Sequence, residues 1–185
     1  MTPTPTARLG GALAALLLAG PSAAQEARPE MVEMEVTAVV PLEGKAAVLV
    51  LGQKGTGTVL PVFIGQPEGS AIEQGIRRVP TPRPLTHDLL GEAIAALGAR
   101  VQRVDIDAFR GSTFHAKVRL TQGAKALTLD ARPSDAVALA VRVRAPIYAD
   151  SRIVKGQGLS RDELDRLRRR QRDAEGSSGD PGTRL

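Results

Sequence analysis

The stretch VDIDAFRGSTFHAKVRL, residues Val104–Leu120, decides the fold because apolar and polar side chains alternate on both sides of a single turn. Such alternation is typical of strands that bury one face, and Arg110-Gly111-Ser112 has the composition of a tight turn. Folding the stretch about this turn matches apolar side chains on one face and opposite charges on the other, which predicts a β-hairpin in one register. The predicted pairs are Val104–Val118, Asp105–Lys117, Ile106–Ala116, Asp107–His115 and Ala108–Phe114.

The residues that follow extend the hairpin into a three-stranded meander and then a helix. A second turn places residues 127–131 against the second strand of the hairpin, with Asp130 opposite Lys117. Arg132-Pro133-Ser134-Asp135 then starts a helix in which apolar residues recur with helical spacing. A short strand at Ile147–Ala149 is predicted after this helix.

The N-terminal half contains three further predicted strands and two predicted helices. The strands are Met31–Val40, Ala46–Leu51 and Thr58–Ile64, which together can form a meander. One helix follows Gly65 with Pro67 at its first position, and the other spans Leu89–Leu97 with Thr86 as its cap. The apolar stripe predicted to bury the second helix consists of Leu89, Leu90, Ile94 and Leu97. Together these elements predict an α+β fold, with a mixed, largely antiparallel, curved sheet and three or four helices in a single domain.

The first 24 residues have the features of a secretory signal. Arg8 precedes an uncharged apolar run from Leu9 to Gly20, and small residues lead up to Ala24, after which we expect cleavage. The run is too short to cross a bilayer comfortably, although a membrane-anchoring or disordered N-terminus is the alternative. We expect an exported product, periplasmic or extracellular, with no integral membrane segment after cleavage. The expected organisation is a signal peptide at residues 1–24, a domain at residues 25–158, and an Arg-rich polar helix with a disordered tail at residues 159–185.

The composition excludes several kinds of site. The chain has 185 residues and no cysteine, which excludes disulfides, thiolate metal ligands and a cysteine nucleophile. Its two histidines, His87 and His115, cannot form a multi-histidine metal cage within one chain. Four aromatic residues are too few for an extended platform on which single-stranded nucleic acid stacks. The net charge of +5 is compatible with a polyanionic ligand but does not require one.

Two segments share a pattern that suits anion binding, namely RPLTHD at residues 83–88 and RPSD at residues 132–135. In each segment an arginine and a proline precede a hydroxyl and an acid at a helix start, where free backbone N–H groups favour anions. His87 could transfer protons near neutral pH, and several nearby aspartates could hold a divalent cation. The structural alternative is that Thr86 and Ser134 only cap helices, that the acids only favour helix starts, and that Asp130 pairs with Lys117.

At these positions the chain resembles the bifunctional nuclease family. The resemblance runs from about Met31 to Asp150 and rests on VLPVFIGQPEGSAI (Val59–Ile72), TPRPLTHDLL (Thr81–Leu90) and LDARPSDAVALAVR (Leu129–Arg142). The family usually has Glu–Ala where this chain has Glu68-Gly69, a difference that weakens the helix locally but keeps the carboxylate. The resemblance implies an α+β fold, a homodimer, and nuclease activity on both DNA and RNA.

The positions that match the family motifs carry our hypothesis for the site. We assign His87 to general acid–base catalysis, with Asp88 and Asp135 as further catalytic residues. The predicted substrate-binding residues are Arg83, Thr86, Arg132 and Ser134. The predicted ligands of a divalent metal, Mg²⁺ or Mn²⁺, are Glu68, Asp88, Asp130 and Asp135. These assignments require the two turns to face a common cleft.

The expected function is metal-assisted hydrolysis of phosphodiester bonds in DNA and RNA with little sequence preference. The alternative is a non-enzymatic regulatory domain in which the same two turns bind an anion or a protein partner.

Overall fold

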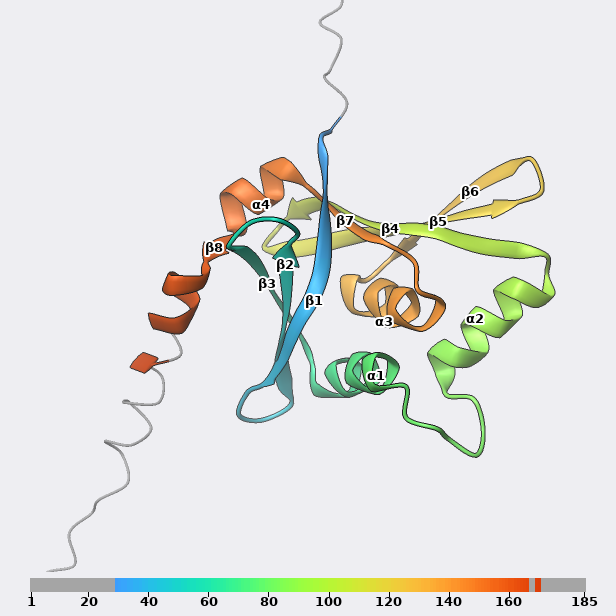
Figure 1. The fold of residues 1–185 in the computed structure, drawn as a ribbon, viewed down its shortest axis with the longest axis horizontal. Coiled ribbons are helices and arrows are strands. Elements are labelled where there is room, and N and C mark those ends of the chain that lie inside the picture. Colours follow the sequence, from blue (N-terminus) through green and yellow to red (C-terminus); the bar gives the residue numbers. More distant parts are fainter. Residues whose placement is uncertain (1–28, 167–168, 171–185) are drawn as a thin grey trace, which may run out of the picture.

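The computed structural model describes residues 29–166 and 169–170, which form an α+β fold (Figure 1). The signal peptide predicted at residues 1–24 lies outside the described residues, as does the tail at residues 175–185 that was predicted to be disordered. Among the described helices, none combines the length and the apolar character that crossing a bilayer requires.

One eight-stranded sheet forms the frame of the molecule, with the strand order β6-β5-β4-β7-β1-β2-β3-β8. All neighbouring strands pair antiparallel except β4 and β7, which are parallel, so the predicted mixed and largely antiparallel sheet is confirmed. The strands are β1 (Met31–Pro41), β2 (Ala46–Gln53), β3 (Thr58–Gly65), β4 (Ala99–Arg110), β5 (Thr113–Gln122), β6 (Lys125–Ala131), β7 (Ile147–Asp150) and β8 (Leu159–Ser160).

The labelled helices are α1 (Gln66–Arg77), α2 (Thr86–Ala96), α3 (Pro133–Val143) and α4 (Ser151–Gln157), and residues 161–166 and 169–170 are also helical. The sheet curves around α1 and α3, which lie side by side (Figure 1). Helix α3 is the central one, because it contacts α1, α2, β4 and β5 and buries most of its residues from Pro133 to Ala140. The sequence did not predict α4, which is short and follows β7 directly.

The β4–β5 hairpin confirms three of the predicted pairs and corrects two. Val104, Asp105 and Ile106 pair with the expected residues, but the register then shifts by a β-bulge before Ala108. A bulge places two residues of one strand opposite one residue of its partner. His115 therefore lies opposite Ala108 rather than Asp107, and the Asp107 carboxylate forms an ion pair with Lys117 at 2.5 Å.

The bulge also brings two aromatic rings together. Phe109 pairs with Phe114, where the sequence had predicted Ala108, and their ring centroids lie 4.6 Å apart. Such a tilted aromatic pair fixes the orientation of both rings. The third strand of this meander keeps the predicted register, since Asp130 lies opposite Lys117 between β6 and β5.

The apolar stripe predicted for α2 is confirmed at Ile94 and wrong at its other three positions. Leu89, Leu90 and Leu97 are exposed, and Leu89 keeps 59% of its surface accessible, whereas Ile94 keeps 8%. The inward-facing positions are His87, Gly91 and Ile94, which follow one another at helical spacing. Gly91 lies against Val143 of α3. A polar residue and a glycine thus occupy the buried stripe, which an argument from apolar periodicity cannot detect.

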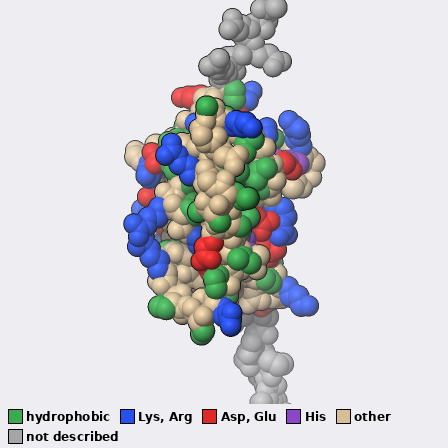
Figure 2. All heavy atoms as spheres, turned by 90° about the vertical axis from the view of Figure 1, so that its right-hand side faces the viewer, with side chains coloured by type: hydrophobic (Ala, Val, Ile, Leu, Met, Phe, Trp, Pro, Cys, Tyr) green, Lys and Arg blue, Asp and Glu red, His purple; other side chains and the backbone are tan. Residues whose placement is uncertain are grey.

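The exposed leucines lie on the side of the molecule that carries α2 and β6. Viewed from that side, hydrophobic side chains are distributed among lysines and arginines across the surface (Figure 2). Leu127 and Leu129 of β6 are exposed as well.

The two faces of α2 should respond differently to truncation. We expect Ile94→Ala to lower the free energy of unfolding by about 2–4 kcal/mol, because it leaves a cavity in the core. The matched change Leu89→Ala on the exposed face should alter it by less than about 0.5 kcal/mol. Urea unfolding followed by circular dichroism measures both values, and equal losses would show that the leucines are covered in the native protein.

Candidate active site

The two predicted anion-binding turns meet at the ends of α2 and α3. His87 lies in the first turn of α2 and Asp135 in the first turn of α3, and the imidazole Nε2 is 3.3 Å from the Asp135 Oδ1 atom across 48 residues of sequence. Both side chains line a cavity of about 310 Å³ that also has Thr86, Glu68 and Arg132 in its wall. The requirement that the two turns share a cleft is therefore confirmed.

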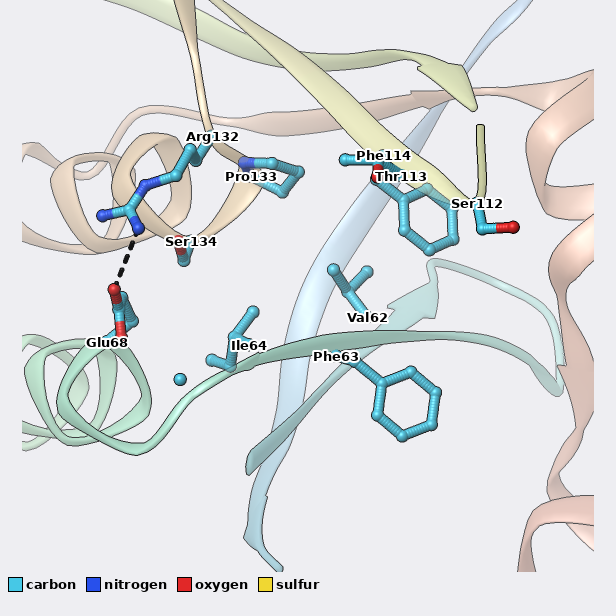
Figure 3. Close-up of a pocket in the computed structure, with 11 residues that line it drawn as sticks. Val62, Phe63, Ile64, Glu68, Ser112, Thr113, Phe114, Arg132, Pro133 and Ser134 are labelled. Carbon is cyan, nitrogen blue, oxygen red and sulfur yellow. Dashed lines mark hydrogen bonds and ion pairs between the residues drawn. The ribbon is translucent and has the colours of Figure 1, made fainter. Parts of the chain in front are cut away.

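Arg132 connects the cleft to α1. Its guanidinium donates to both carboxylate oxygens of Asp135, at 2.7 and 3.3 Å, and to the Oε1 atom of Glu68 at 3.0 Å (Figure 3). These bonds use three of the five guanidinium N–H groups, so two donors have no partner among the described residues. Because the side chain is 66% exposed, the two donors are available to an anion that enters from solvent.

Glu68 reaches Arg132 because the residue before α1 is a glycine. A Cβ atom at Gly65 would collide with the Oε2 atom of Glu68, so a side chain at this position would displace the carboxylate. Pro67 occupies the second position of α1 rather than the first, since the helix begins at Gln66. The sequence Gly65-Gln66-Pro67-Glu68 therefore places a carboxylate over the start of α1 and within reach of the start of α3.

Asp135 is held in its ionised form. Partial burial raises the pKa of its carboxyl, but the hydrogen bonds from Arg132 and His87 and the charge of Arg132 outweigh this effect and lower the pKa below its ordinary value of 3.8. An ionised Asp135 can orient the His87 ring and stabilise a positive charge on it, as the carboxylate does in a catalytic dyad.

Asp88, predicted as a catalytic and metal-binding residue, has structural partners on both of its oxygens. Its Oδ1 accepts a hydrogen bond from the Nε of Arg142 at 2.6 Å, and its Oδ2 accepts one from the backbone N–H of Leu85 at 3.0 Å. Arg142 is buried, with 7% of its side chain exposed, and its Nη1 also donates to the carbonyl oxygens of Ala71 and Ala138. Asp88 therefore ties the start of α2 to α3 and α1.

Neither hydroxyl caps its helix through the side chain. The cap positions are Leu85 and Arg132, while Thr86 takes the first position of α2 and Ser134 the second position of α3. The N–H of Leu85 is satisfied instead by the carboxylate of Asp88. Thr86 is exposed and lines this cavity, whereas Ser134 is buried and does not line it.

Besides Asp88 and Ser134, two further predicted site residues do not line the cleft. Arg83 is exposed in the connector before α2, where its carbonyl accepts a hydrogen bond from Thr81. Asp130 is exposed on β6 and forms no ion pair with any residue in the described part of the chain. The sequence missed Arg142, although it closes the motif at residues 129–142 and its charge complements that of Asp88.

The carboxylates of the site do not fit a metal ion as they are arranged. Within residues 29–166 and 169–170, no three histidine or acidic side chains gather closely enough to hold one. Glu68 and Asp135 are the acids nearest to each other in the cleft, and the guanidinium of Arg132 already occupies the position between them.

Comparison with known proteins identifies one family and several relatives. The sequence model of the bifunctional nuclease domain matches residues 49–162. An uncharacterized protein of Mycobacterium tuberculosis is 41% identical over 112 residues, which are 60% of this chain and 66% of that protein. Bifunctional nuclease 1 of Oryza sativa subsp. indica is 26% identical over 118 residues, which are 61% of this chain and 35% of the plant protein.

A second plant relative matches a similar share. Bifunctional nuclease 2 of Arabidopsis thaliana is 24% identical over 117 residues, which are 62% of this chain and 36% of the plant protein. The chain thus spans just under two thirds of the mycobacterial protein and about a third of each of these plant relatives.

The structural role of Asp88 can be separated from a catalytic one. Asp88→Asn should lower the free energy of unfolding by about 1.5–3 kcal/mol, because it removes a charged partner of the buried Arg142 guanidinium. Glu92→Gln, a matched change at an exposed carboxylate of the same helix, should change it by less than about 0.5 kcal/mol. Urea unfolding provides the measurement, and an unaltered Asp88→Asn protein would contradict the structural role.

The lowered pKa of Asp135 predicts a pH dependence of stability. Because the carboxyl titrates at a lower pH in the folded than in the unfolded chain, its stabilising contribution is complete above the ordinary pKa of 3.8 and is lost as the pH falls through the lowered value. We therefore expect the wild type to lose its advantage in unfolding free energy over Asp135→Asn as the pH falls from 3.8 through the lowered pKa of Asp135. Asp130→Asn, which removes an exposed carboxylate without an ion pair in the described part of the chain, serves as the control.

Proposed function

The chain belongs to the bifunctional nuclease family, and from this premise we propose that it hydrolyses phosphodiester bonds in DNA and RNA with little sequence preference. The observation that carries the proposal is the presence of His87, Asp135 and Arg132 in one cavity, the first two 3.3 Å apart. An acid–base group, its orienting carboxylate and an exposed guanidinium are the parts that phosphodiester hydrolysis requires.

His87 would move the protons of the reaction. Its Nε2–H donates to Asp135, which leaves Nδ1 as the proton acceptor of the neutral ring. A water molecule that attacks phosphorus gives its proton to Nδ1 as the new P–O bond forms. The bond from phosphorus to the leaving oxygen then breaks, and that oxygen takes a proton from the imidazolium. Asp135 stays ionised throughout and stabilises the charge on the ring.

Arg132 would bind the phosphate. Its two unpaired N–H donors suit the two non-bridging oxygens of a phosphodiester, and its bonds to Asp135 and Glu68 fix the plane of the guanidinium. Thr86 and Ser134 could add hydroxyl contacts from the ends of α2 and α3. Arg83 lies outside the cavity and would contact a phosphate of the nucleic acid at some distance from the scissile bond. Phosphate contacts carry no sequence information, which accounts for the low sequence preference.

Dependence on Mg²⁺ or Mn²⁺ stays a prediction. Phosphate oxygens of the substrate commonly complete the coordination of such ions, so a requirement for metal can arise only once substrate is bound. Comparing cleavage in Mg²⁺, in Mn²⁺ and in chelator tests this requirement.

Export and assembly also stay proposals. The apolar run between Arg8 and Ala24 supports export to the periplasm or the exterior after removal of residues 1–24. The exposed leucines on α2 support the proposed homodimer, since apolar side chains on one face are typical of an interface.

The alternative is a non-enzymatic domain that binds an anion or a protein partner. It is favoured by the fact that Arg132 already has two carboxylate partners, as a guanidinium with a structural role would have. The two functions differ in whether the substrate is cleaved.

The two histidines provide a matched test of the proposed function. Purified protein is incubated with single-stranded DNA and with RNA, in Mg²⁺, Mn²⁺ or chelator, and the products are separated on a gel. We expect His87→Ala to lower the cleavage rate about 10²–10⁴-fold, the usual contribution of a general acid–base group. His115→Ala should cleave at the wild-type rate, because His115 lies on β5 and is absent from the cavity wall.

Two outcomes would contradict this assignment. Equal cleavage by the wild type and His87→Ala would remove His87 from the chemistry. Binding without cleavage under every metal condition would support the non-enzymatic alternative instead.

A further inference from the structure

A second cavity, of about 410 Å³, adjoins the cleft and shares Glu68 and Arg132 with it. Its volume falls in the range of pockets that hold small organic ligands. At the end away from Arg132 the wall contains three apolar side chains, Phe114 from β5 and Val62 and Phe63 from β3 (Figure 3). The Glu68–Arg132 ion pair closes the opposite end, so an apolar group in this cavity would lie next to a phosphate on Arg132.

The chain concentrates its few aromatic residues at this cavity. Phe63 and Phe114 are two of the four aromatic side chains in the whole sequence, and Phe114 is held in place by its contact with Phe109. Phe63 keeps 74% of its surface exposed, although it is a large apolar side chain on a strand. Figure 3 shows its ring on the side of β3 away from Val62 and Phe114, so the ring lies at the rim of the cavity, where a flat ligand can stack on its exposed face.

The cavity also has polar side chains in its wall. Ser134 is buried and offers a hydroxyl beside the Arg132 end, and Ser112 and Thr113 offer hydroxyls at the turn between β4 and β5. Hydroxyl groups both donate and accept hydrogen bonds, so they do not select one base over another by themselves.

We infer that this cavity is a nucleobase subsite, in which the base next to the scissile phosphate stacks on Phe63 while the phosphate lies on Arg132. The inference rests on the proposed nuclease function and deepens it, because it specifies the substrate. Since a base can enter the pocket only when it is released from its pair, the substrate is single-stranded or locally unpaired nucleic acid.

The absence of tryptophan from the sequence allows a direct test. In Phe63→Trp the full chain gains a single tryptophan at the cavity mouth, and base stacking should quench its fluorescence. We expect saturable quenching by thymidine monophosphate and by single-stranded DNA, but not by deoxyribose phosphate, which has no base. Leu97→Trp, at an exposed position beyond the end of α2, is the matched control and should show no saturable quenching.

Cleavage of a strand with one abasic residue extends the test. Phe63→Ala should cleave normal single-stranded DNA about tenfold more slowly or worse at subsaturating substrate, since stacking on one ring is worth about 1–3 kcal/mol. At the abasic position, Phe63→Ala should cleave at the same rate as the wild type. Phe63→Tyr, which keeps the ring, should retain activity on both substrates.

The outcomes separate this inference from the proposed function. Equal quenching in Phe63→Trp by deoxyribose phosphate, or equal cleavage by wild type at normal and abasic positions, would overturn the nucleobase subsite and leave the nuclease function standing. Base-dependent quenching together with no cleavage of any strand would support the subsite and remove the nuclease function. Quenching by an apolar peptide but not by nucleotides would also overturn the inference, in favour of a protein partner.

Discussion

The site depends on the hydrogen bonds that the buried guanidinium of Arg142 donates. The guanidinium lies between three helices, donating to Asp88 at the start of α2, to the carbonyl of Ala71 in α1 and to the carbonyl of Ala138 in its own helix. A buried charge without a partner is strongly unfavourable, so α2 is held with its N-terminal end against α3. This constraint explains why the inward stripe of α2 contains His87 and Gly91 rather than the leucines, and it brings His87 to Asp135.

The strands could be predicted from the sequence because alternation is a local signal and pairing is limited to a few registers. The pairs Val104–Val118 and Ile106–Ala116 and the whole β5–β6 register follow from matching apolar and charged faces. The pairs Asp107–His115 and Ala108–Phe114 failed because a bulge inserts one residue without changing the pattern of residue types. The parallel pairing of β4 with β7 joins segments separated by β5, β6 and α3, and no local pattern specifies it.

The site could be predicted only in part, because its helix starts are local signals whereas the partners of its side chains are not. The two Arg-Pro turns can be recognised as helix starts, but the sequence does not show that they meet, as His87 and Asp135 do. The partners of each carboxylate could not be derived, because they depend on where the helices pack. Asp88 has the residue type of a metal ligand, but its oxygens are taken by Arg142 and by the Leu85 N–H. Asp130 has the same residue type on the far end of a strand and is left exposed.

The charge balance of the cleft constrains how it can receive a phosphodiester. Glu68 and Asp135 carry two negative charges against the single positive charge of Arg132, so the cluster is net negative while His87 is neutral. Protonation of His87 makes the cluster neutral and removes a repulsion of the anionic substrate. Binding of phosphate and protonation of the ring are therefore coupled, and each favours the other. In the proposed mechanism this coupling acts after the ring has taken a proton from water, when negative charge increases on the phosphorus oxygens and the imidazolium beside them is most stabilising.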